Sequence, residues 1–148
     1  MEERFETFTV LINKISRNIR KLKNVAMSEY GLRSTHVSCL YYLYSAGSMT
    51  ATQLCERCDE DKATISRALD LLEEKGFVTC RSNTAKRYNS YLMLTEQGKE
   101  VSERIFAKVT HILDEIGEGL SEEERITLYK NLMTISDNLV KVTNAYSE

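Results

Sequence analysis

The middle of the chain contains two consecutive helix patterns, each with its own N-cap. Thr50 and Gln53 have the spacing of a capping box, in which a hydroxyl and an amide satisfy backbone N–H groups that the start of a helix leaves unpaired. Asp61 supplies a second N-cap just before a new apolar period. The pattern therefore predicts a helix over residues 51–58, a tight turn, and a second helix over residues 62–75.

The second predicted helix has two chemically different faces. Four apolar residues recur at helical spacing and predict a buried stripe: Ile65, Ala68, Leu69 and Leu72. Small and hydrogen-bonding residues occupy the other face and the first turn: Lys62, Ala63, Thr64, Ser66, Arg67 and Asp70. Such side chains allow a helix to approach base edges closely, and the backbone donors of its first turn favour phosphate. A solvated helix with no partner would show the same pattern.

The next residues predict a β-hairpin with a basic tip. Two β-prone runs, 77–80 and 88–94, flank a polar loop. Residues 75–95 contain no acid but include four cations: Lys75, Arg81, Lys86 and Arg87. Cations at a hairpin tip can reach the DNA backbone or minor groove beside a docked helix, whereas a solubilising turn is the alternative. Helix, turn, helix and hairpin together predict a mainly α fold with a small β wing, a winged helix-turn-helix, over residues 32–95.

Three stretches of this pattern resemble a known family. Residues 31–40, the run LCERCDEDKATISRALDLLEEKGFVTC and the run LMLTEQGKE are similar to the multiple-antibiotic-resistance regulator (MarR) family of bacterial transcription factors. The resemblance implies a homodimeric winged-helix repressor that binds specific duplex DNA and releases it when a small molecule or an oxidant arrives. The residues then expected to contact DNA are Arg33, Ser34, Thr35, Lys62, Ala63, Thr64, Ser66, Arg67, Arg81, Lys86 and Arg87.

The wing departs from the family pattern. Wings of the family commonly carry Asp-Arg-Arg, and Lys86, Arg87 and Tyr88 occupy these positions here. Cys80 stands where the family often has arginine. We expect the altered positions to change how the wing arginine is oriented, while the positive charge of the wing is retained.

The resemblance also implies an effector pocket between the dimerisation helices and the winged region. His36, Tyr41 and Phe106 are the candidate ligand-binding residues, with Tyr42 and Tyr44 nearby in the sequence. Aromatic rings and one titratable group suit phenolic or aromatic acids. A role in the core or on the solvated surface is the alternative for each of these side chains.

Both ends of the chain predict amphipathic dimerisation helices, over residues 1–30 and 121–146. Apolar residues recur in steps of three and four: Phe5, Phe8, Ile12, Ile15, Ile19, Leu22 and Ala26 in the first, and Leu128, Leu132, Ile135, Leu139, Val142 and Tyr146 in the second. A connecting helix capped by Thr95 is predicted over residues 96–117. One winged domain of this size cannot bury all these stripes, so we expect a two-fold homodimer that places two recognition helices on successive major grooves. Intramolecular packing is the alternative.

Composition limits the remaining classes of protein. The 148 residues suit a single domain, and 42% apolar with 28% charged residues allow a core. No run is apolar enough for a membrane helix or a secretory signal, which predicts a cytoplasmic protein without a membrane partner. The net charge is −2, but basic residues outnumber acidic ones over residues 1–95 and acidic residues dominate 96–148. The acidic half is expected to face away from DNA.

The four cysteines are expected to be reduced and mostly structural. Cys55 and Cys58 have C-x-x-C spacing, but a zinc site needs about four ligands and Cys39 and Cys80 are scattered in the sequence, so no metal site is predicted. Cys80 is the redox candidate because Arg81 would favour its thiolate. No catalytic motif or glycine-rich phosphate loop is present, which predicts no enzyme and no cofactor. A redox-sensing regulator, a thiol oxidoreductase and a winged-helix protein-interaction module remain alternatives.

Overall fold

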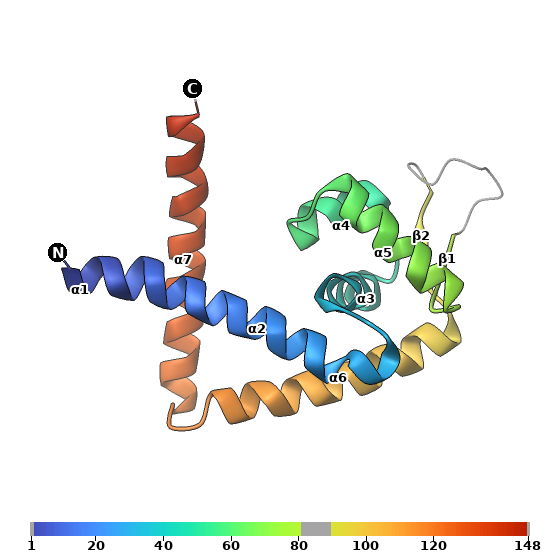
Figure 1. The fold of residues 1–148 in the computed structure, drawn as a ribbon, viewed down its shortest axis with the longest axis horizontal. Coiled ribbons are helices and arrows are strands. Elements are labelled where there is room, and N and C mark those ends of the chain that lie inside the picture. The colour runs from blue at the N-terminus through green and yellow to red at the C-terminus, as the bar shows by residue number, and fades with distance from the viewer. Residues whose placement is uncertain (1, 81–89, 148) are drawn as a thin grey trace. The chain divides into compact units, whose positions relative to one another are not determined.

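The computed structural model describes residues 2–80 and 90–147, and most of these residues are helical (Figure 1). They form two compact units, residues 1–108 and 109–148. The elements are α1 (Glu2–Phe5), a π-helical segment η1 (Glu6–Leu11), α2 (Ile12–Ala26), a short 3₁₀ helix η2 (Ser28–Tyr30), α3 (Ser34–Ala46), α4 (Ala51–Cys58), α5 (Lys62–Glu74), β1 (Val78–Cys80), β2 (Leu92–Leu94), α6 (Glu96–Ile116) and α7 (Glu122–Tyr146). Within this part of the chain, no helix combines the length and apolar character needed to cross a bilayer.

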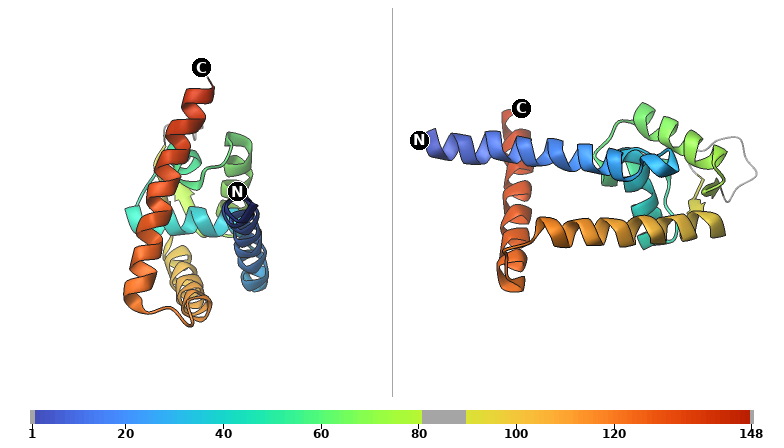
Figure 2. Two further views of the ribbon diagram at one scale, coloured as in Figure 1. Left: turned by 90° about the vertical axis from the view of Figure 1, so that its left-hand side faces the viewer. Right: turned by 60° about the horizontal axis from the view of Figure 1, so that its bottom comes forward.

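Helix α3 is the centre of the first unit. It packs against α2, α4, α5 and β2, and the two views of Figure 2 show α4 and α5 together on one side of it. The largest fully buried aliphatic side chains come from several elements: Leu40, Leu43, Leu54, Ile65, Leu69, Leu72, Leu92 and Ile105. Each such side chain contributes roughly 1.5–3 kcal/mol by leaving water. The predicted stripe of the second helix is thus confirmed as its buried face.

The helix-turn-helix begins and ends where the caps predict. Thr50 and Gln53 form the capping box, with Thr50 N donating to Gln53 Oε1 at 2.8 Å and Gln53 N donating to Thr50 Oγ1 at 3.3 Å. Helix α4 ends at Cys58, and the next residue, Asp59, adopts the left-handed conformation with φ of 53°. Asp61 then caps α5 by accepting a hydrogen bond from Thr64 N at 2.8 Å. Asp59 at the end of α4 and Asp61 at the start of α5 therefore bound a short turn between the two helices.

The hairpin stem is antiparallel, with Val78 opposite Leu94 and Cys80 opposite Leu92. Leu92 also pairs with Met49, which precedes α4, through two backbone hydrogen bonds of 2.8 and 3.1 Å. The second strand is shorter than predicted, because Ser90 and Tyr91 are not in strand conformation. The described pairing of the two strands begins at Leu92, opposite Cys80.

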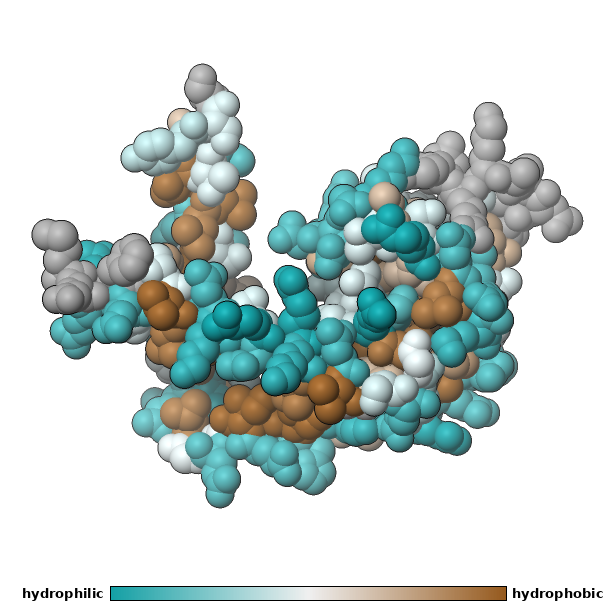
Figure 3. Space-filling model, viewed as in Figure 1, coloured by the Kyte–Doolittle hydropathy of each residue, from teal (hydrophilic) through white to brown (hydrophobic). Residues whose placement is uncertain are grey.

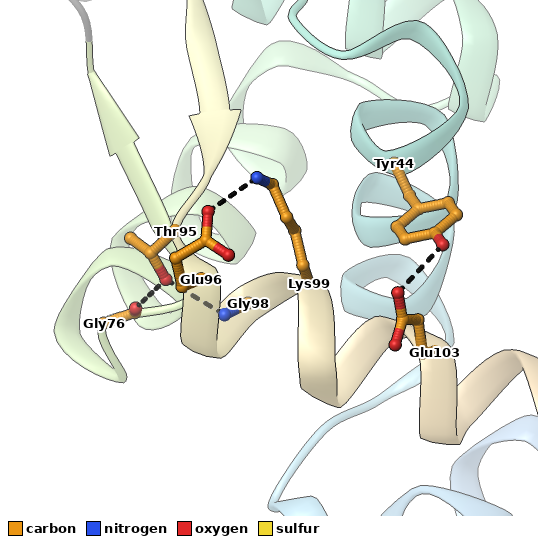
Figure 4. Close-up of polar contacts among 7 residues, drawn as sticks. All are labelled: Tyr44, Gly76, Thr95, Glu96, Gly98, Lys99 and Glu103. Atoms are coloured by element: carbon orange, nitrogen blue, oxygen red, sulfur yellow. Dashed lines mark hydrogen bonds and ion pairs between the residues drawn. The ribbon is translucent and has the colours of Figure 1, made fainter.

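The hairpin joins α6 through a compact hydrogen-bonded junction (Figure 4). Thr95 Oγ1 donates to the Gly76 carbonyl at 2.6 Å and accepts from Gly98 N at 2.9 Å. Thr95 N donates to the Phe77 carbonyl at 3.0 Å. The predicted helix cap by Thr95 is confirmed, and the same residue ties the start of α6 to the end of the helix-turn-helix.

The N-terminal helical segment is less regular than predicted. A single helix was expected over residues 1–30, but the segment contains the π-helical turn η1, and α2 ends at Ala26. Gly31, with φ of 64°, follows η2, and Leu32 N bonds back to Met27 O at 3.2 Å. This turn explains why the helix stops: Met27 is fully buried and directs the chain toward α3.

The second unit consists of the end of α6, a turn and α7. Ser121 and Glu124 form the capping box expected from the sequence, with hydrogen bonds of 2.8 and 3.3 Å. No residue of α7 is buried, and apolar side chains are open to view along it in Figure 3.

Candidate nucleic-acid interface

The outward face of α5 carries the side chains that the sequence singled out. Lys62, Ala63, Ser66 and Arg67 are exposed, and Thr64 is half-buried. The opposite side of the helix is held in the core through Ile65, which is fully buried. A helix fixed on one side and small and polar on the other can lie in a groove without rearranging its own core contacts.

Three residues of this face are linked to one another. Thr64 donates to the Asp61 carboxylate from both its backbone N, at 2.8 Å, and its hydroxyl, at 2.9 Å. Arg67 Nη2 donates to Thr64 Oγ1 at 3.2 Å. The two hydrogen bonds from Thr64 hold the pKa of Asp61 below its usual value, with a smaller contribution from the charge of Arg67. The link orients the guanidinium of Arg67 along the exposed face, a relation that residue types alone did not reveal.

The start of α3 holds the predicted phosphate-binding residues. Arg33 is exposed, and Ser34 and Thr35 are half-buried. Ser34 N donates to Asn24 Oδ1 at 2.8 Å, so a side chain from α2 already satisfies one backbone donor of this helix start. The role of Asn24 could not be predicted from the sequence, because a cap supplied from ten residues upstream has no local signal.

His36 also acts at the start of α3. Its Nδ1 accepts a hydrogen bond from Arg33 N at 2.8 Å, which requires this nitrogen to be unprotonated. Burial lowers the pKa of His36, and the positive charges of Arg33 and Lys75 lower it further. The structure therefore gives His36 a capping role, while its predicted contact with an effector stays a prediction.

Acidification is expected to destabilise the first unit through His36. In the folded chain the pKa of His36 lies below the ordinary histidine value of 6.5, so the unfolded chain binds the proton at a higher pH than the folded chain does. The stabilisation from neutral His36 is therefore complete above pH 6.5 and is lost as the pH falls toward the pKa of the folded chain. Urea unfolding at about pH 7.5 and about pH 5.5 measures the loss. His36→Gln keeps an acceptor without titrating and should reduce the difference. Equal pH dependence in His36→Gln and the parent would contradict this assignment.

Four aromatic rings gather where α3 meets the first half of α6. Tyr41 contacts Tyr42 and Phe106 edge to face, with ring centroids 5.3 and 5.6 Å apart, and Tyr44 contacts Phe106 at 5.3 Å. Tyr44 donates its hydroxyl to Glu103 at 3.1 Å, as Figure 4 shows. Tyr41 remains 51% exposed, so part of this aromatic surface is available to a ligand. Of the predicted effector residues, the structure brings Tyr41 and Phe106 together.

Comparison with known proteins places the chain in a family. A model of the MarR family matches residues 30–87, and the HTH-type transcriptional repressor YetL of Bacillus subtilis is 30% identical over 132 residues, which cover 82% of this chain and 77% of YetL. The chain belongs to the MarR family of transcriptional regulators. A MarR family regulator from Silicibacter pomeroyi shares the fold with a TM-score of 0.81 at 20% identity, over 95% of each chain. The S. aureus MepR–DNA complex shares it with a TM-score of 0.77 at 20% identity, over 90% of this chain and 97% of MepR.

The wing of this MarR-family chain is described only at its stem. Cys80 ends β1 and is half-buried, while Thr79 and Tyr91 are exposed. The predicted wing contacts of Arg81, Lys86 and Arg87 lie outside the described residues, as does the arginine expected to activate Cys80.

The other three cysteines differ in their burial. Cys39 is buried, but Cys55 and Cys58 are half-buried, because α4 is a short helix that covers α3 with one face only.

Proposed function

We propose that this MarR-family chain is a homodimeric repressor that binds a pseudo-palindromic operator and is released by an aromatic or phenolic small molecule. The observation that carries the proposal is the outward face of α5, where small side chains surround an oriented Arg67 at the N-terminal half of the helix. Lys62, Thr64, Ser66 and Arg67 would meet bases and flanking phosphates in the major groove. The occurrence of the same fold in the S. aureus MepR–DNA complex supports this docking mode.

The exposed apolar rows of the terminal helices support a homodimer. Phe8, Ile12, Ile15, Ile19 and Leu22 are between 37% and 46% exposed, and on α7 Leu128, Leu132, Leu139 and Val142 are between 39% and 52% exposed. Soluble monomers rarely leave such continuous apolar surface in water. A second copy of the chain offers the same rows and can bury them around a two-fold axis.

The aromatic surface around Tyr41 and Phe106 supports an effector of aromatic type. Edge-to-face ring contacts leave ring faces open, and a planar ligand can stack on them. The name of YetL as a transcriptional repressor supports repression as the sign of regulation. Binding of the effector would then release DNA.

Selection of bound sites from random duplexes tests the function directly. The purified full chain should enrich a pseudo-palindromic site whose half-sites lie about one helical turn apart. Affinity should fall steeply with salt, because cations of the protein replace counterions on phosphate. Aromatic acids should release the selected duplex. Binding that is absent or insensitive to salt would instead favour a winged-helix module for protein partners.

Replacement of Arg67 by alanine should relax base preference at one position of each half-site. The expected loss on the selected site is about 1–3 kcal/mol, or roughly fivefold to 150-fold in affinity, with a smaller loss on sites changed at that position. Competition binding with single-base variants of the operator measures this pattern. Arg104→Ala on the exposed face of α6 removes the same charge elsewhere and should keep the preference. An unchanged base preference in Arg67→Ala would exclude Arg67 from base contact.

A further inference from the structure

One side of α2 carries three exposed cations. The helix contains five basic residues and no acidic one, and the nearest acids in the sequence are Glu6 and Glu29. Arg17, Arg20 and Lys21 are all exposed. In the part of the chain that the structure describes, none of these three side chains forms an ion pair. Together they form the basic face of α2, a positive surface that no acid of the same protomer neutralises by direct contact.

The hydrogen bond of Asn24 shows where this basic face points. Residues three, four and seven apart share one side of an α-helix, so Arg17, Arg20, Lys21 and Asn24 lie on the same side of α2. The side chain of Asn24 accepts a hydrogen bond from Ser34 N at 2.8 Å. The basic face therefore occupies the side of α2 that meets the first turn of α3, within roughly 10 Å of helix length before that contact.

The apolar row of α2 lies on a different side of the helix. Each residue turns an α-helix by about 100°, so Arg17 and Lys21, each two residues from Ile19, lie roughly 200° away from it. A second copy of the chain that covers the apolar row leaves the basic face in solvent. An amphipathic helix that binds a membrane buries its apolar side in lipid, so the row cannot serve a dimer and a bilayer at the same time. This favours a partner that is recognised by negative charge alone.

The start of α3 continues the positive surface. Arg33 is exposed there and is one of the residues expected to hold phosphate. Lys75, at the end of α5, lies near the same turn, since the charges of Arg33 and Lys75 both lower the pKa of His36. Duplex DNA presents an unbroken line of phosphates, with one charge per roughly 1.7 Å of its axis. A duplex held at Arg33 has further phosphates whose charge complements the basic face of α2.

We propose that the basic face of α2 binds the sugar-phosphate backbone of duplex DNA, next to the phosphates held at the start of α3. The contact adds affinity without reading sequence, because phosphates are alike at every base pair. It extends the DNA contact of each protomer beyond the winged region. The inference rests on the proposed function for the placement of the duplex, but base recognition by α5 does not require it.

The salt dependence of duplex binding tests this contact. Each cation that neutralises a phosphate contributes about 0.9 to the steepness of log affinity against log salt. Arg17→Ala/Arg20→Ala/Lys21→Ala should therefore reduce the steepness by about 3 per protomer and lower affinity for the selected duplex at least about tenfold, with base preference unchanged. Arg17→Lys/Arg20→Lys keeps the charge and the helix propensity, so this matched control should retain the steepness of the parent.

Hydroxyl-radical footprinting of the selected duplex locates the contact. Sugars that lose protection in the triple alanine variant should adjoin those that lose protection in Arg33→Ala. An unchanged salt dependence, an unchanged footprint, or an equal loss in the lysine control would each overturn the proposal. Binding of the parent to phosphatidylserine vesicles that the triple alanine variant loses, with the salt dependence of DNA binding unchanged, would assign the basic face to a membrane instead.

Failure of the proposed function gives a different result. If the parent binds duplexes without base preference and the triple alanine variant reduces the steepness, the contact by α2 stands and operator recognition fails. If the variant binds the selected operator with the salt dependence of the parent, operator recognition stands and the contact by α2 fails. A parent that binds no duplex at any salt concentration refutes both. Should the triple variant fail to fold, Arg17→Ala alone decides, with an expected reduction of about 0.9 per protomer.

Discussion

Gly98→Ala is expected to destabilise the first unit by about 3 kcal/mol or more, a large part of the stability of an ordinary domain. A Cβ on Gly98 would lie 1.9 Å from the Phe77 carbonyl oxygen and 2.8 Å from its carbon. Both are backbone atoms, and the Phe77 oxygen already accepts a hydrogen bond from Thr95 N. Neither backbone segment can move away without breaking hydrogen bonds, because Thr95 bonds to Gly98 N and to the Gly76 carbonyl at the same time.

Urea unfolding followed by helical circular dichroism measures this loss. Glu100→Ala on the exposed face of the same helix is the matched control and should change stability by no more than about 0.5 kcal/mol. Alanine is favoured over glycine in an unobstructed helix by up to about 1 kcal/mol, so Gly98→Ala would stabilise the chain if nothing lay against this position. A loss of stability therefore indicates the close contact with Phe77. A Gly98→Ala chain as stable as the control would mean that α6 does not lie against the hairpin as the structure shows.

The contrast between Thr50 and Gly98 explains which parts of the fold the sequence predicts. The cap at Thr50 is local, because its partner Gln53 lies three residues away and the two side chains satisfy each other. The role of Gly98 depends on Phe77, which is brought to it by the turn of the whole hairpin. Glycine in a helical pattern gave no sign of this close approach, and only the assembled junction reveals it.

In the candidate site, too, the sequence predicts the local features but not the contacts between helices. The exposed and buried faces of α5 follow from helical spacing, so the sequence correctly predicts that Ser66 is exposed and that Ile65 is buried. The cap that Asn24 supplies to Ser34 and the hydrogen bond from Tyr44 to Glu103 each join two different helices. Such contacts depend on tertiary packing, which residue patterns predict only as a general need to bury apolar surface.

The apolar row of the N-terminal helix is predicted by periodicity and is exposed in the structure, and both observations favour its contact with a second chain. The sequence predicts the row, and the structure leaves Ile15 46% and Ile19 42% exposed. Burial of a Leu- or Ile-sized side chain contributes roughly 1.5–3 kcal/mol, so several such residues from two copies supply a substantial driving force for association. A charge placed within the row would have to be desolvated in the dimer.

If the proposed dimer forms through this row, Ile19→Glu is expected to convert it into monomers and to weaken operator binding by about a hundredfold or more, because two linked half-site contacts become independent. Analytical ultracentrifugation measures the mass, and titration of the selected duplex measures affinity. Lys21→Glu adds the same acid on the opposite side of α2, so it should remain dimeric. Retention of the parent mass by Ile19→Glu would show that this row lies outside the dimer interface. Monomeric mass with undiminished affinity would instead show that one recognition helix and its wing are sufficient for binding.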